Sequence, residues 1–204
     1  MIRAIDHVVA AVPELDEAAR AFEAAGFTVT PRADHPFGTS NRLIVTEGSY
    51  LELVSVTNPE LVPPAGFAAK IAAKLAADDT GIAFLVLKSQ DAAADHALLV
   101  GTGESDGDVL RFGRPAPLVG GGTIRAEFSL VFTKAGRVFY CQHHTPEAVW
   151  NRAAMNHGNG AKKMTAVGFD AGQELDGIDL LDEPGMTFDG GNRQFQMAGM
   201  TVCY

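Results

Sequence analysis

The two stretches that decide the fold are IDHVVAAV at residues 5–12 and YLELVSV at residues 50–56. Both are short apolar runs, typical of strands that are buried on at least one face. Each run also holds an ionisable residue among apolar neighbours, His7 in the first and Glu52 in the second. An ionised carboxylate in such a place is costly unless a cation, a metal or several hydrogen-bond donors meet it. His7 and Glu52 therefore either contact each other or both bind something else.

The composition is that of a globular protein and excludes several function classes. A chain of 204 residues, 47% hydrophobic and 20% charged, can form one sizeable core or two small modules that share one. A net charge of −9 without a cluster of Lys and Arg argues against nucleic-acid binding. No run approaches the length of a membrane span, and no basic segment followed by an apolar one opens the chain. We therefore expect a cytoplasmic protein without a membrane partner.

The first 58 residues follow the order strand, helix and three strands. Pro13 and Gly26 bound a segment whose apolar residues recur with the i, i+3, i+4, i+7 spacing of a helix. Short apolar runs predict the following strands, and a polar bend at residues 35–41 and a Glu-Gly turn separate them. These strands are expected at residues 27–31, 42–46 and 50–56.

The same order returns from Gly81, which indicates an internal duplication. A strand at residues 81–87 and a helix at 91–100 precede strands at 109–113, 123–133 and 137–144. We expect an α+β fold in which tandem βαβββ modules form a curved mixed sheet around a shared cavity. The modules span residues 1–58 and 80–145, and residues 59–79 form a connector with an amphipathic helix. Residues 146–204 are expected to add a helix capped by Thr145 and a shortened β unit that completes the sheet.

The motifs in these modules resemble those of a known family. The duplicated module, the first-strand sequence IDHVV and the fourth-strand sequence YLEL are similar to the vicinal-oxygen-chelate superfamily, which includes glyoxalase I, extradiol dioxygenases and bleomycin-resistance proteins. HPFGTSNRL at residues 35–43, FYCQHHTPE at 139–147 and HGNGA at 157–161 resemble glyoxalase-like-domain proteins more closely. The resemblance covers roughly residues 4–170 and implies a glyoxalase-like fold with a small-molecule site.

In this superfamily a divalent metal ion is held by a first-strand histidine and a fourth-strand acidic residue, with partners from the paired module. The resemblance therefore implies His7 and Glu52 as ligands, and their donor atoms suit Zn, Fe, Mn, Co or Ni. The second module departs from the pattern, because Ile82 stands where its first strand would supply a ligand. On its last strand, Gln142 or His144 would complete the site. The alternative is an internal ion pair or hydrogen bond between the strands.

Several other polar residues are expected to contact a small-molecule ligand. Arg42 would orient an anionic substrate or, equally, pair with a carboxylate of the protein. His35 lies in a polar bend, and loops at the mouth of a cavity often carry specificity. The full set of expected substrate-binding residues is His35, Asn41, Arg42, Tyr50 and Tyr140. His143 is expected to be a solvated or capping residue. Arg111, Arg114 and Arg125 are expected on the surface, with a basic lining for an anion as the alternative.

Two functions follow from these assignments. The first is a metal-dependent lyase, isomerase or dioxygenase for a small oxygen-chelating metabolite, in which Glu52 also acts as a proton acceptor. The second is a metal-free binding or sequestering protein of the bleomycin-resistance type. A third ligand from the second module would favour the enzyme, whereas a direct contact between His7 and Glu52 would favour the binding protein. The shortened C-terminal unit would leave exposed sheet edges that a homodimer would cover.

Overall fold

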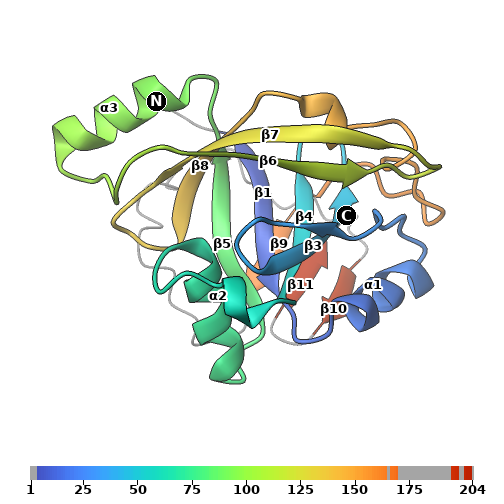
Figure 1. Ribbon diagram of the computed structural model, residues 1–204. Coiled ribbons are helices and arrows are strands. Elements are labelled where there is room, and N and C mark those ends of the chain that lie inside the picture. Colours follow the sequence, from blue (N-terminus) through green and yellow to red (C-terminus); the bar gives the residue numbers. More distant parts are fainter. Residues whose placement is uncertain (1–3, 165, 170–193, 198–199, 204) are drawn as a thin grey trace.

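The computed structural model describes residues 4–164, 166–169, 194–197 and 200–203, and an eight-stranded mixed sheet curves around its centre (Figure 1). The strands of this sheet are β1 (Ile5–Ala11), β2 (Ala33–Asp34), β3 (Thr39–Val45), β4 (Tyr50–Val56), β5 (Gly81–Lys88), β6 (Leu110–Pro117), β7 (Thr123–Phe132) and β8 (Val138–His143). The helices of the described part are α1 (Leu15–Ala24), α2 (Phe67–Ala76) and α3 (Ala92–Thr102), with 3-10 turns η1 (Pro59–Leu61) and η2 (Pro146–Ala148).

The strand order repeats one plan twice. The sheet runs β2-β3-β4-β1-β5-β8-β7-β6, so β1 lies beside β4 in the first module as β5 lies beside β8 in the second. Both pairs are parallel, whereas β1 and β5 meet antiparallel where the modules join. This confirms the expected tandem βαβββ modules in one curved mixed sheet. The first and fourth strands of each module lie at the centre of the sheet, where their side chains are shielded from water.

The helices cover the two faces of the sheet unequally. The helical spacing of α1 buries Phe22 and its neighbours against the outer face of the first module, in one cluster with Val8. The corresponding helix of the second module, α3, packs Leu99 against Val131 of β7. The connector helix α2 packs on the concave side instead, where Phe67 joins a core built from both modules. Among the described residues, none of the helices is both long enough and apolar enough to cross a membrane.

The two edge strands of the sheet lie against each other. β2 is only two residues long, and β6 contains Pro115 and Pro117, which lack the N–H groups that a further strand would need. β2 and β6 contact each other across the opening of the curve, so the sheet is nearly closed. These edges present few free backbone groups to a partner chain. The expected homodimer stays a prediction, which light scattering can test.

Three local expectations differ from the structure. Residues 27–31 form no strand, because Thr30 pairs with Leu43 of β3 through only its own backbone N–H and hydroxyl. The helix expected after Thr145 is limited to η2, and the Thr145 hydroxyl accepts a hydrogen bond from the Glu127 amide instead of capping a helix. The C-terminal strands β9 (Ala166–Phe169), β10 (Gln194–Met197) and β11 (Met200–Cys203) form a separate sheet rather than completing the large one. Residues 170–193 of that expected unit lie outside the described residues.

Candidate functional site

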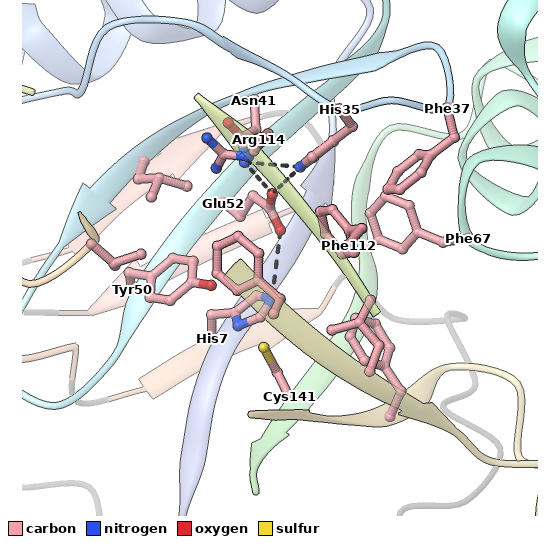
Figure 2. A pocket seen from close by; sticks show the side chains of 15 residues that line it. His7, His35, Phe37, Asn41, Tyr50, Glu52, Phe67, Phe112, Arg114 and Cys141 are labelled. Atoms are coloured by element: carbon pink, nitrogen blue, oxygen red, sulfur yellow. Dashed lines mark hydrogen bonds and ion pairs between the residues drawn. The ribbon is translucent and has the colours of Figure 1, made fainter. Parts of the chain in front are cut away.

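A small cavity lies on the concave side of the sheet, between the two modules and α2 (Figure 2). Its volume is about 40 Å³, which is room for roughly three water molecules. Aromatic and aliphatic side chains make most of its wall. The lining residues are His7, His35, Phe37, Asn41, Leu43, Tyr50, Glu52, Phe67, Phe112, Arg114, Phe128, Leu130, Phe139, Cys141 and Val149. A mostly apolar lining with a few convergent polar groups suits a small ligand that has a polar and an apolar part.

Glu52 is the centre of the polar groups in the cavity. It is only 6% exposed, and its Oε1 accepts a 2.5 Å hydrogen bond from the Asn41 amide. His7 Nε2 lies 3.5 Å from Glu52 Oε2, and His35 Nε2 lies 3.6 Å from Oε1. Both separations are longer than a normal hydrogen bond. The groups converge because β4 lies between β1, which carries His7, and β3, which carries Asn41. Four of the expected site residues are thus brought together.

Asp6 fixes the orientation of the His7 ring. Asp6 Oδ2 lies 2.7 Å from His7 Nδ1 and 2.8 Å from His143 Nε2. The pairing of β1 with β5 is irregular between Ile5 and His7, and such a bulge re-aims a side chain that would otherwise alternate to the other face. Burial would raise the pKa of Asp6, but the hydrogen bonds with His143 and His7 outweigh it and hold the pKa below its usual value. An ionised Asp6 accepts the His7 Nδ1 proton, which leaves Nε2 directed at Glu52.

His35 presents an unprotonated nitrogen to the same carboxylate. Its Nδ1 lies 2.8 Å from Thr39 Oγ1, and its Nε2 lies 3.3 Å from the Asn41 side-chain nitrogen. Because an amide nitrogen only donates, Nε2 of His35 is the accepting nitrogen. Burial, reinforced by the charge of Arg114, lowers the pKa of His35 well below its usual value. The ring is therefore neutral near pH 7.

The second module contributes apolar walls and one cation to the cavity. Its phenylalanines come from β6, β7 and β8. Arg114 of β6 is buried, contrary to the surface position expected for it, and burial lowers its pKa while the charge of Glu52 opposes this shift. Cys141 of β8 is a free, buried thiol whose pKa is raised by burial. Arg114 and Cys141 both line the cavity. For Arg114 this agrees with the alternative considered from the sequence, a basic lining, and not with the surface position that was preferred.

The strand β5 supplies no metal-binding side chain to the cavity, as expected. The reason differs, however, because Ile82 does not face the cavity from the first strand of the second module. Ile82 packs in the core on the outer side of the sheet. The pairing of β1 with β5 shifts between Val9 and Ala10, and Ala83 and Phe84 both join the concave side. Neither side chain has a donor atom for a metal.

The last strand of the second module turns its other face to the cavity. The expected residues were Tyr140, Gln142 and His144. Side chains alternate along β8, and Phe139 and Cys141 take the concave face, whereas Tyr140 packs outside. Tyr140 is therefore not among the cavity-lining residues. An alternating pattern leaves the choice of face open, and the larger apolar core on the concave side decides it here.

Gln142 and His144, which were expected to complete a metal site, make other contacts. Gln142 accepts a hydrogen bond from the backbone N–H of Ala92 and donates one to the Gln90 carbonyl, both beside α3. His144 Nε2 lies 2.8 Å from Ser129 Oγ. The structure therefore does not bring either residue to the Glu52 cluster. The neighbouring His143, expected to be solvated or capping, contacts Asp6 instead.

Tyr50 lies in the cavity, whereas Arg42 does not. The Tyr50 ring stacks on the His7 ring with centroids 4.3 Å apart and planes 12° apart. Burial raises the pKa of Tyr50 well above its usual value, so its phenol stays protonated. Arg42 Nη2 lies 2.8 Å from Asp16 Oδ1 of α1 on the outer face. Arg42 therefore pairs with a carboxylate of the protein, which was one of the two roles considered for it; the other was to orient an anionic substrate.

Comparison with known proteins adds the family. Residues 5–176 match the sequence model of the glyoxalase-like domain. The chain belongs to this glyoxalase-like-domain family. The resemblance to the vicinal-oxygen-chelate superfamily seen in IDHVV and YLEL is thereby confirmed. No curated protein sequence matches the chain.

Solved structures show likeness at the level of the fold. A hypothetical protein from Staphylococcus aureus is similar with a TM-score of 0.57 and 18% identity, over 72% of this chain and 62% of that one. A hypothetical protein from Bacillus halodurans has a TM-score of 0.49 and 17% identity, over 70% of this chain and 94% of that one. Methylmalonyl-CoA epimerase from Streptomyces coelicolor, in complex with 2-nitronate-propionyl-CoA, has a TM-score of 0.48 and 20% identity, over 71% and 96%.

The glyoxalase-like fold implies a divalent metal ion, and the donor atoms around Glu52 fit one. Metal bonds to imidazole nitrogen and carboxylate oxygen measure about 2.0–2.2 Å, so two ligands of one tetrahedral ion lie about 3.4 Å apart. His7 Nε2 and Glu52 Oε2 are 3.5 Å apart. Ligand atoms of Asp6, His7 and His143 also lie within 4.8 Å of one another. There, however, Asp6 is hydrogen-bonded to both rings, which is the role of an outer partner that orients a ligand.

Proposed function

We propose that this glyoxalase-like protein is a metal-dependent enzyme in which His7, Glu52 and His35 hold a divalent ion. The observation that supports this most strongly is the approach of two imidazole nitrogens to one buried carboxylate at 3.5 and 3.6 Å, beyond hydrogen-bond distance. An arrangement in which acceptor atoms face one another without a bridging proton is unfavourable, and a cation between them relieves it. Two histidines and one carboxylate are also a common ligand set for a catalytic ion with open positions.

All three proposed ligands come from the first module, so the second-module ligand that was expected to favour the enzyme is absent from this set of described residues. His35 takes the place that Gln142 or His144 was expected to fill, and its ring is neutral, as a metal ligand must be. Asp6 holds the His7 ring with Nε2 toward Glu52. Asn41 donates to Glu52 Oε1 and so restrains the carboxylate while Oε2 stays toward His7. This outer shell fixes the tautomer of one ligand and the rotamer of another.

The proposed reaction is proton transfer on a small metabolite that carries two neighbouring oxygens, as in an isomerase or a lyase. A bound divalent ion would polarise a substrate oxygen and stabilise negative charge on it. Glu52 would accept the proton from the adjacent carbon, since it is the buried carboxylate in the cavity. Tyr50, protonated and stacked on His7, would remain a hydrogen-bond donor. The same ligand set also serves dioxygenases that use ferrous iron, so the identity of the metal decides between these classes.

The experiment is elemental analysis of the purified protein after loading with Zn, Mn, Fe, Co or Ni, followed by titration with the metal that binds best. We expect roughly one ion per chain in the wild type and a loss of affinity in His7→Gln and Glu52→Gln. His144→Gln is the matched control, because His144 is a part-buried histidine that contacts Ser129 and not the cavity. A wild type without metal after loading, or equal loss in His144→Gln, contradicts the proposal.

A metal-free binding protein is the second candidate. The short distances between the polar side chains around Glu52 favour it. The 2.5 Å hydrogen bond from Asn41 would restrain Glu52 without an ion, and a proton between His7 Nε2 and Glu52 Oε2 would take the place of the cation. In that case the loaded protein contains no metal, and a thermal-shift screen of small molecules detects a ligand. Substitution of Glu52 by Gln would then change the ligand affinity only modestly.

A further inference from the structure

Arg114 is a buried cation whose capacity for hydrogen bonding is almost unused. Its side chain is 5% exposed and lines the cavity from β6. A guanidinium has five N–H donors, yet among the described residues Arg114 donates one hydrogen bond, a 3.3 Å bond from Nη1 to the Pro115 carbonyl. Its Nε is shielded from solvent and has no partner in the described part of the chain. A buried charged donor without an acceptor is destabilising.

The Glu52 carboxylate does not use these donors. Its charge opposes the effect of burial on the pKa of Arg114, so the two groups interact electrostatically. The close neighbours of the Glu52 oxygens are nevertheless Asn41, His7 and His35. Figure 2 shows the Arg114 side chain beside Asn41 and Glu52, at the same end of the cavity. Arg114 is therefore placed next to the proposed catalytic cluster with most of its donors available.

We propose that Arg114 binds the carboxylate of the substrate, and that the substrate is a small 2-oxo or 2-hydroxy monocarboxylic acid. This inference rests on the proposed function, which places the neighbouring substrate oxygen at His7 and Glu52. A carboxylate accepts two parallel hydrogen bonds from one guanidinium, and these would satisfy donors that the protein leaves unpaired. The carboxylate and the oxygen on the next carbon then meet the cation and the Glu52 cluster, which lie at one end of the cavity.

The size and polarity of the cavity restrict the acid further. A volume of about 40 Å³ suits a short carbon skeleton. The Arg114 guanidinium carbon lies 5.8 Å from the centre of the Phe128 ring, and Phe112 packs beside that ring with a centroid separation of 5.3 Å. A single guanidinium among aromatic rings matches a planar, singly charged group better than a phosphate dianion, which calls for several donors. The apolar walls would contact the alkyl end of the acid.

The test compares acids with their amides, because each pair keeps its shape and differs in charge. Lactate with lactamide, pyruvate with pyruvamide, and the four- and five-carbon homologues are titrated into metal-analysed protein by calorimetry. We expect the wild type to bind the best acid about ten- to a hundredfold more tightly than its amide, as a charged hydrogen-bonded pair predicts. Arg114→Gln should lose this preference and keep its metal content.

Two further variants make the test independent of folding defects. Arg114→Lys keeps the charge but not the planar fork, so it should retain part of the preference for the acid. Arg111→Gln is the matched control, because Arg111 lies on the same strand, is exposed and faces Glu127 at 3.9 Å. Arg111→Gln should bind acids as the wild type does.

The outcomes separate this inference from the proposed function. A wild type that binds acid and amide equally, that binds none of the acids, or whose preference survives in Arg114→Gln overturns the role of Arg114. A metal-free wild type that prefers acids through Arg114 overturns the proposed enzyme but supports the anion site. A metal-bearing protein without any preference for acids supports the proposed metal site but overturns the anion site at Arg114.

Discussion

The two modules share one topology but differ in chemistry. The concave face of the first module carries His7, Asn41 and Glu52 on its strands, with His35 in the bend before β3. The concave face of the second module carries mainly aromatic and aliphatic side chains, and Arg114 is its one cation in the cavity. The two modules therefore repeat one strand topology, but the side chains that they supply to the cavity differ.

The difference between the modules places the polar groups on one side of the cavity and the apolar wall on the other. In a symmetric site, the first and fourth strands of both modules would face one another with ligands. Here Phe84 of β5 lies in the concave core, and Phe139 and Cys141 of β8 line the cavity, so this wall has low polarity. Such a wall strengthens the electrostatic interactions of the polar half, because water is excluded from it. The second module thus supplies surroundings and an anchoring charge, and the first supplies the donor atoms.

The largest effect is expected from breaking the apolar wall. Phe139→Ala removes a side chain that is 2% exposed and in contact with the rings of Phe84 and Phe67. We expect it to lower the free energy of unfolding by about 3–5 kcal/mol while the folded protein keeps its metal. Denaturant unfolding and elemental analysis measure the two effects. Leu110→Ala, at a 37% exposed position of β6, should change stability by less than about 0.5 kcal/mol.

A stability change in Phe139→Ala as small as that of Leu110→Ala would show that the second module is not a packed wall. Loss of metal from folded Phe139→Ala would show that this module takes part in binding the ion.

An intermediate effect is expected from loosening the outer shell of the first module. Asp6→Asn replaces the carboxylate that orients His7, and it should weaken metal binding about 10- to 100-fold. Asp95→Asn is the matched control, because Asp95 is equally buried but hydrogen-bonds Ser89 beside α3 in the second module. Competition with a chelator measures both affinities. Equal affinities in Asp6→Asn and the wild type would remove Asp6 from the site.

The smallest effect is expected at His157, which ties the segment after the second module to the first. His157 Nδ1 accepts a hydrogen bond from the Thr28 N–H, and Nε2 donates to the Val45 carbonyl. Burial lowers the pKa of His157, although the Val45 bond opposes this shift. The unfolded chain therefore binds a proton first as the pH falls below about 6.5, and the stability from neutral His157 is lost between that pH and the lower pKa of the folded state.

The denaturant midpoint of the wild type should thus decline between pH 7 and pH 5 more steeply than that of His157→Gln. Identical slopes for the two proteins would show that His157 does not titrate with a lowered pKa. Other buried histidines contribute to both slopes, so the difference between the proteins is the quantity to compare.

Much of the fold was predictable from the sequence, because apolar periodicity and turn residues act locally. The periodicity placed α1, α2, β4 and β7, and the repeated order of elements predicted the curved sheet. The strand predicted at residues 27–31 was wrong, because this segment makes too few hydrogen bonds to β3 for a β ladder. The C-terminal unit was expected in the large sheet, and the partner of an isolated strand cannot be derived from its own residues.

The site residues were predictable only where the pattern of a single strand was enough to single them out. His7 and Glu52 stood out as polar residues in apolar runs, and they do lie together. Asp6 was missed because it reaches the His7 ring through an irregularity in strand pairing that leaves no mark in the sequence. Arg114 was expected on the surface, and a lining position was only the alternative, for another reason. Its strand lies at an edge and is half exposed, and only the closure of β6 against β2 makes the position interior.

X-ray absorption spectroscopy of the metal-loaded protein tests most directly the claim that the first module alone binds the ion. We expect two imidazole ligands at about 2.0–2.1 Å in the wild type. We expect one imidazole ligand in His35→Gln and no change in His144→Gln. Two imidazole ligands in His35→Gln, or a wild type that binds no ion at all, would show that the first module does not bind the ion in this way.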